Sequence, residues 1–142
     1  MCFDFSAFSL ENFSDPCQQE LHPQARVGLT LFAEGRYFEA HEALEQAWRE
    51  SSGPQRALYQ GILQVGVAYH HILQGNYAGA LKMFTRAQAN LEAFERPCSG
   101  VDVPRLREDA RRVELALRAL GEARIHELDR KLFKPVPMII SE

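Results

Sequence analysis

The residues of this sequence whose types and spacing could support chemistry begin with His41 and Glu45, in the segment GRYFEAHEALEQAW. They stand four residues apart, so a helix here would project both side chains from one face toward the same neighbour. An imidazole and a carboxylate in this arrangement could bind a metal ion or move a proton. The string HEALE, however, has Glu45 where the zinc motif HExxH has its second histidine, so that motif is not met.

A second group of polar residues lies in the otherwise apolar segment that follows. Gln60, Gln64 and His71 fall on or near one helical stripe, and His70 lies on an adjacent one. Polar groups on such a helix cost stability unless they are paired. We therefore expect the glutamines and one histidine to lie opposite the histidine and carboxylate of the preceding segment, in a buried polar cluster.

Three interpretations of this cluster remain open. It could be a structural network in which Glu45 orients His41. It could instead be a pocket for a small polar molecule or a peptide end. The expected lining of that pocket is His41, Glu45, Trp48, Gln60, Gln64 and His70. A metal or hydrolytic site is the third interpretation, with Glu42 as the candidate base. Its expected ligands are His41, Glu45 and His70 or His71. In the structural interpretation, the helical spacing of Trp48 from Leu44 is typical of a core anchor.

The elements that must position these residues are predicted to be helices. Apolar residues recur at three- and four-residue intervals between breaks at glycine and proline. The predicted helices run from Pro16 to Gly35, Tyr37 to Glu50, Pro54 to Gln74, after Asn76 to Phe94, and from Asp102 onward. We expect one domain, with residues 1–14 as a lead-in, 15–133 as a helical bundle and 134–142 as an extended tail.

Two stretches can be superposed at a spacing of 40 residues, AEGRYFEAHEAL from Ala33 and LQGNYAGALKMF from Leu73. Their shared glycine, tyrosine and alanine resemble the turn and second helix of a tetratricopeptide repeat, although the spacing is longer than the roughly 34 residues of that repeat. The predicted fold class is therefore all-α, a compact bundle of about five helices built from two such hairpins. His41 stands opposite the apolar Leu81 of the second copy, which makes the first copy the candidate site.

Composition restricts the classes of function. Apolar residues make up 46% of the 142 residues and charged residues 25%, as in an ordinary globular protein. A net charge of −3 argues against nucleic-acid binding, which usually needs a basic surplus. No apolar run is long enough to span a membrane, so we expect no membrane association.

The three cysteines, Cys2, Cys17 and Cys98, are odd in number and form no CxxC pair. This pattern predicts neither a zinc–thiolate site nor a disulfide framework, and it favours a reducing compartment. With no basic, apolar leader at the N-terminus, the sequence predicts a cytoplasmic protein.

The segment GRYFEAHEALEQAW followed by YQGILQVGVAYHHILQGNYAGAL is similar to the bacterial and archaeal family called domain of unknown function 309. The resemblance covers about Phe32 to Phe94. It implies an all-helical fold. Its characteristic residues correspond to His41, Glu42, Glu45, Trp48, Gln60, Gly61, Gln64, His70, Gly75 and Asn76. Some members resemble metal enzymes closely enough in this polar motif to be described as metal-dependent hydrolases.

From these sequence features we expect a binding module, and not an enzyme, that binds a small ligand or a protein partner. The alternative is a metal-dependent hydrolase that uses a divalent metal, and a third option is an interaction scaffold with a purely structural network. Exposed phenylalanines near the N-terminus could support a homodimer.

Overall fold

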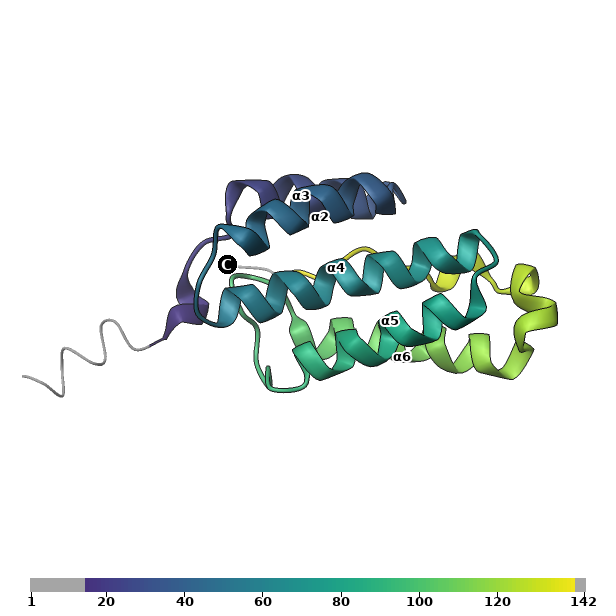
Figure 1. Ribbon diagram of the computed structural model, residues 1–142. Helices are drawn as coiled ribbons and strands as arrows, with labels where there is room; N and C mark the ends of the chain where they lie inside the picture. The colour runs from purple at the N-terminus through teal and green to yellow at the C-terminus, as the bar shows by residue number, and fades with distance from the viewer. Residues whose placement is uncertain (1–14, 140–142) are drawn as a thin grey trace, which may run out of the picture.

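The computed structural model describes residues 15–139, and its regular elements are helical (Figure 1). The predicted lead-in of residues 1–14 and the last three residues of the predicted tail lie outside the described residues. The α-helices are α2 (Pro23–Ala33), α3 (Tyr37–Arg49), α4 (Pro54–Leu73), α5 (Tyr77–Leu91) and α6 (Val103–Leu120). Short 3-10 helices are η1 (Pro16–Gln18), η2 (Glu122–Glu127) and η3 (Arg130–Leu132). The predicted all-α bundle is confirmed.

The predicted first helix starts too early. Asp15 does cap a helical turn, since its carboxylate accepts a hydrogen bond from the Cys17 backbone N–H at 3.0 Å, but that turn ends at Gln18. Helix α2 starts only at Pro23. A helix running through residue 23 would lose a backbone hydrogen bond there, and His22 before the proline is extended, with ψ 141°. Pro23 therefore opens a helix and cannot continue one.

The two hairpins turn in the same way. Gly35 and Gly75 both adopt φ of 78°, a conformation that glycine reaches without steric cost. The N–H of Gly35 donates to Phe32 O at 3.0 Å, and the N–H of Gly75 donates to Ile72 O at the same distance. A hydrogen bond from the glycine N–H back to a carbonyl of the preceding turn is a usual ending of a helix. The internal repeat is thus a repeat of helix, glycine turn and helix.

Helix α4 is the central element and packs against α3 on one side and α5 on the other (Figure 1). Its glycines make room for neighbouring side chains. A Cβ added to Gly61 would lie 2.5 Å from Leu91 Cγ of α5, and one added to Gly66 would lie 3.1 Å from Phe32 Cε2 of α2. Large side chains of the neighbouring helices therefore occupy the space left at these two glycines.

A disulfide between Cys17 and Cys98 corrects the prediction that the cysteines stay unpaired. The two residues are 81 positions apart, so no local spacing pattern reveals the pair. Folding brings η1 against the loop before α6, where Ser99 N donates to Cys17 O at 2.7 Å. Gln55 of α4 donates to Pro16 O at 2.6 Å and holds the same segment. The expectation of a reducing compartment therefore loses its argument from the cysteines.

The segment after η3 returns along the bundle toward the start of α6 (Figure 1). Asp102 N donates to Pro137 O, and Ile139 N donates to Gly100 O, both at 2.9 Å. Farther back, the ring of Phe133 stacks on Tyr69 of α4 with centroids 4.6 Å apart. The segment is therefore anchored at both ends. Within residues 15–139, no helix has the length and apolar character needed to cross a membrane.

Candidate binding site

Helix α3 buries one side and presents the predicted site residues on the other. Leu44 and Ala47 are fully buried against the core. His41, Glu45 and Trp48 recur at intervals of four and three residues and are only half-buried. Phe38, which the sequence analysis did not assign to the site, lies on the same side of α3 and is 56% exposed. The predicted residues therefore line a surface and do not form a buried cluster.

His41 and His70 are brought together by way of Phe38. The centroid of the Phe38 ring lies 6.1 Å from that of His41 on α3 and 6.1 Å from that of His70 on α4. Helices α3 and α4 thus each place one histidine ring beside Phe38. The aromatic ring between them carries no polar group, so these contacts are apolar.

Glu45 does not orient His41. Its carboxylate accepts a hydrogen bond from Arg49, one turn later on α3, at 3.0 Å. Glu42, the candidate base, is exposed on the same helix. The expected histidine–carboxylate pair is therefore not formed.

Trp48 forms the other end of this surface. The guanidinium of Arg56 lies over its ring at 4.8 Å from the centroid, and Arg56 also donates to the Trp48 carbonyl oxygen at 3.3 Å. A cation over an indole face is a favourable contact. Trp48 is half-buried, so the expectation that it is a core anchor is met only in part.

The two glutamines of α4 separate. Gln64 is 8% exposed, and its side-chain oxygen accepts a hydrogen bond from Asn90 of α5 at 2.8 Å. It belongs to the α4–α5 contact, on a different side of α4 from His70. Gln60 is half-buried. The α3–α4 face is defined from here on as Phe38, His41, Glu42, Glu45, Trp48, Gln60 and His70.

His71 sits beside this face at the end of α4. Its Nδ1 is 3.3 Å from the side-chain nitrogen of Asn76, and its ring centroid is 6.4 Å from that of His70. Burial, and secondarily the neighbouring His70, lowers the pKa of His71 below its ordinary value of 6.5. His71 is therefore neutral at physiological pH.

A metal centre requires at least three ligand side chains that converge on one point. Among residues 15–139, no group of three or more histidine, cysteine, aspartate or glutamate side chains could hold a metal ion. His41, Glu45, His70 and His71 accordingly do not fit a metal centre in this arrangement. The divalent metal stays a prediction from the sequence.

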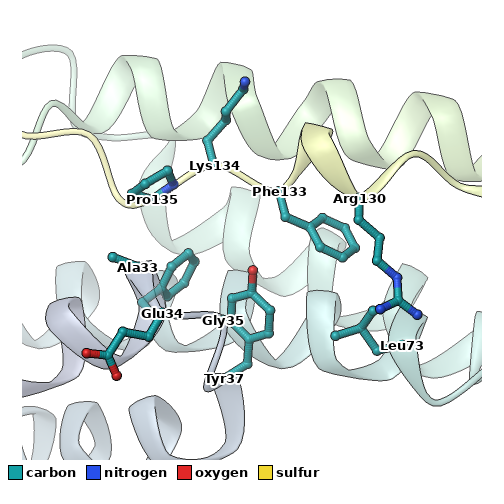
Figure 2. Close-up of a pocket in the computed structure, with 10 residues that line it drawn as sticks. Ala33, Glu34, Gly35, Tyr37, Leu73, Arg130, Phe133, Lys134 and Pro135 are labelled. Carbon is teal, nitrogen blue, oxygen red and sulfur yellow. The ribbon is translucent and has the colours of Figure 1, made fainter.

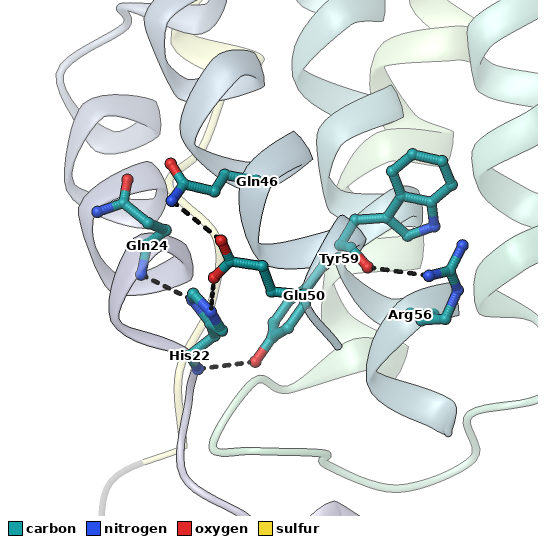
Figure 3. Close-up of polar contacts among 7 residues, drawn as sticks. His22, Gln24, Gln46, Glu50, Arg56 and Tyr59 are labelled. Atoms are coloured by element: carbon teal, nitrogen blue, oxygen red, sulfur yellow. Dashed lines mark hydrogen bonds and ion pairs between the residues drawn. The ribbon is translucent and has the colours of Figure 1, made fainter. Parts of the chain in front are cut away.

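A polar cluster that sequence reasoning missed joins α2, α3 and α4 (Figure 3). His22 accepts a hydrogen bond from the Gln24 backbone N–H on its Nδ1 at 3.0 Å, and its Nε2 lies 2.8 Å from the Glu50 carboxylate. The His22 backbone N–H donates to the Tyr59 hydroxyl at 2.9 Å. The position of His22 directly before Pro23 was the available signal, because an N-cap residue often precedes a proline. With its groups satisfied internally, this cluster is structural.

The fold and the α3–α4 face define a small all-helical protein built from helical hairpins with a histidine- and glutamate-bearing surface. The family model described as "Domain of unknown function (DUF309)" matches residues 25–83, which contain most of that face. The resemblance expected from the motif is confirmed over these residues, where the chain is similar to the DUF309 family.

A curated relative is likewise without an assigned activity. "Uncharacterized protein YpuF" of Bacillus subtilis (strain 168) is 33% identical over 93 residues, which are 62% of this chain and 53% of that protein. The chain thus spans about half the length of this relative. No solved structure matches the chain.

Proposed function

We propose that this protein is a partner-binding module and that the α3–α4 face is its docking surface. The observation that carries the proposal is Phe38, a large apolar side chain that is 56% exposed between two histidines. An aromatic residue surrounded by polar groups is the usual centre of a protein–protein contact. The occupant we infer is a protein segment that places an apolar side chain on Phe38.

The polar groups of the α3–α4 face support binding over a purely structural role. Within residues 15–139, the side chains of His41, Gln60 and His70 make no hydrogen bond to the protein. No fully buried side-chain nitrogen or oxygen atom in that part of the chain lacks a partner. The unpaired atoms of these three side chains therefore reach solvent, where an incoming partner can bind them.

Charge favours a partner with a basic residue next to its apolar one. Glu42 and Glu45 both belong to the face, and of the two only Glu45 forms an ion pair within residues 15–139, with Arg49. Glu42 therefore gives the face a carboxylate that a partner can pair with. A lysine or arginine beside the apolar anchor would complement Glu42, and it would speed association more than it strengthens binding.

The test is selection from a random peptide library displayed on phage against the immobilised protein. We expect the enriched peptides to carry an aromatic or aliphatic residue near lysine or arginine. Their affinity should fall about tenfold or more for Phe38→Ala, as for a residue at the centre of an interface.

Leu115→Ala is the matched control, because Leu115 of α6 is a large apolar side chain of similar exposure, 53%. Both variants remove an exposed side chain, so both should stay folded. Equal affinity for the parent and Phe38→Ala, or enrichment of acidic peptides, would contradict the proposal.

A further inference from the structure

A cavity of about 340 Å³ lies beside the α2–α3 turn, and its lining includes no residue of the α3–α4 face (Figure 2). Three stretches distant in sequence form it. They are the α2–α3 turn around Gly35, the end of α4 at Leu73, and the segment from Arg130 to Pro135. Its volume is at the lower end of the range for small-molecule sites, roughly 300–1,000 Å³. A ligand with about one ring would fit.

The wall of this cavity is a cluster of aromatic rings packed edge to face. The Tyr37 ring lies 5.2 Å from Phe32, 5.5 Å from Tyr69 and 6.1 Å from Phe133, measured between centroids. Tyr37 is only 6% exposed, and Phe133 stacks on Tyr69. Such mutually packed rings have little freedom to move. The wall is therefore formed before any ligand arrives, which lowers the cost of binding.

Arg130 supplies a cation at the rim. Figure 2 shows its side chain directed toward Leu73, on the same side of the segment as the Phe133 ring. No carboxylate in residues 15–139 forms an ion pair with it. The other charged residues of the lining point elsewhere in Figure 2, since the Lys134 ammonium and the Glu34 carboxylate are directed away from the Tyr37 hydroxyl. Glu34 is paired with Arg36 at 3.4 Å.

Tyr37 adds a neutral polar group. Figure 2 shows its hydroxyl directed toward the segment that carries Phe133 and Lys134. Burial raises the pKa of Tyr37 above its usual value, so the hydroxyl keeps its proton at neutral pH. The cavity thus offers aromatic faces, one hydroxyl and one guanidinium.

We propose that this cavity binds a small organic carboxylate, with its anionic group on Arg130 and its apolar body against Tyr37 and Phe133. A planar guanidinium pairs with a carboxylate through two parallel hydrogen bonds, which suits a single arginine. A phosphate dianion would draw on more than one cation, and the cavity provides one. This site shares no residue with the α3–α4 face, so either proposal can fail without the other.

The experiment is a titration of isotopically labelled full-length protein with benzoate and with phenylacetate, followed by NMR. We expect saturable shifts of the Tyr37 and Phe133 ring resonances, with a dissociation constant on the order of 1 mM for a ligand of this size. Benzyl alcohol, which has the ring without the charge, should bind about tenfold more weakly.

Two variants separate the anion contact from general charge. Arg130→Gln should weaken benzoate binding about tenfold and leave the affinity for benzyl alcohol unchanged. Lys131→Gln, which removes the neighbouring exposed cation outside the cavity lining, should leave both affinities unchanged. The proposal is overturned if neither carboxylate gives saturable shifts, if Arg130→Gln binds benzoate as the parent does, or if the shifts lie outside the cavity.

Discussion

His22 and Glu50 connect the start of α2 to the end of α3 through a 2.8 Å contact between the imidazole Nε2 and the carboxylate. The other ring nitrogen of His22 accepts the hydrogen bond that caps α2 (Figure 3). One side chain therefore both starts a helix and ties two helices together.

Replacing His22 with alanine should remove the cap and the contact with Glu50 at once. We expect the free energy of unfolding to fall by about 1–2 kcal/mol, the usual range for loss of an N-cap. Urea denaturation would measure it. Gln24→Ala is the control, because only the backbone N–H of Gln24 takes part. Equal stability of His22→Ala and the parent would show that the cap contributes nothing.

Gly61→Ala should destabilise the protein by about 1–3 kcal/mol, because the new Cβ would lie 2.5 Å from Leu91 Cγ. The change improves helix propensity by about 1 kcal/mol, so a net loss of stability can come only from the clash. In a Leu91→Ala background the same substitution should cost much less. A double-mutant cycle with thermal unfolding measures this coupling, and strictly additive effects would show that Leu91 moves aside freely.

Reduction of the Cys17–Cys98 disulfide should lower stability by about 2–4 kcal/mol, because the bond closes a long loop in the unfolded chain. Denaturant unfolding with and without dithiothreitol measures the difference. Alkylation of the unreduced, unfolded protein should modify one cysteine of three. Modification of all three cysteines would exclude the bond.

Stability should fall as the pH is lowered through the ordinary histidine pKa of 6.5, partly because of His71. The pKa of His71 is lowered in the folded protein, so the unfolded chain takes up the proton first and acid favours unfolding. His71→Gln should show a smaller loss of stability between about pH 7.5 and 5 than the parent. Urea midpoints across that range measure it, and identical pH profiles for the two proteins would refute this role of His71.

Much of the fold could be predicted from the sequence, because local rules suffice for it. The apolar stretch that forms α4, the glycine turns at Gly35 and Gly75, and the start of the last long helix near Asp102 all depend on residues within a turn or two of one another. The motif around His41 also indicated the similarity to the DUF309 family over residues 25–83. The exception was Pro16, where a valid local start signal was followed by a second one at Pro23.

The hydrogen-bond partners of the site residues could not be predicted. A helical stripe shows roughly which way a side chain points, but not which neighbouring residue it meets. Gln60 and Gln64 were placed on one stripe, yet Gln64 bonds Asn90 on α5. Glu45 bonds Arg49 one turn away and not the histidine for which it was expected. Which neighbour a polar side chain meets depends on the rotation of each helix about its axis, and core packing decides that rotation.

The sequence by itself determined the helices and their glycine turns, since each rests on contacts between near neighbours in the chain. Only the tertiary structure decided that Cys17 meets Cys98 and that Phe133 lines a cavity together with Tyr37. Those contacts join segments many residues apart. They form only when burial of apolar surface packs the helices and the returning segment together.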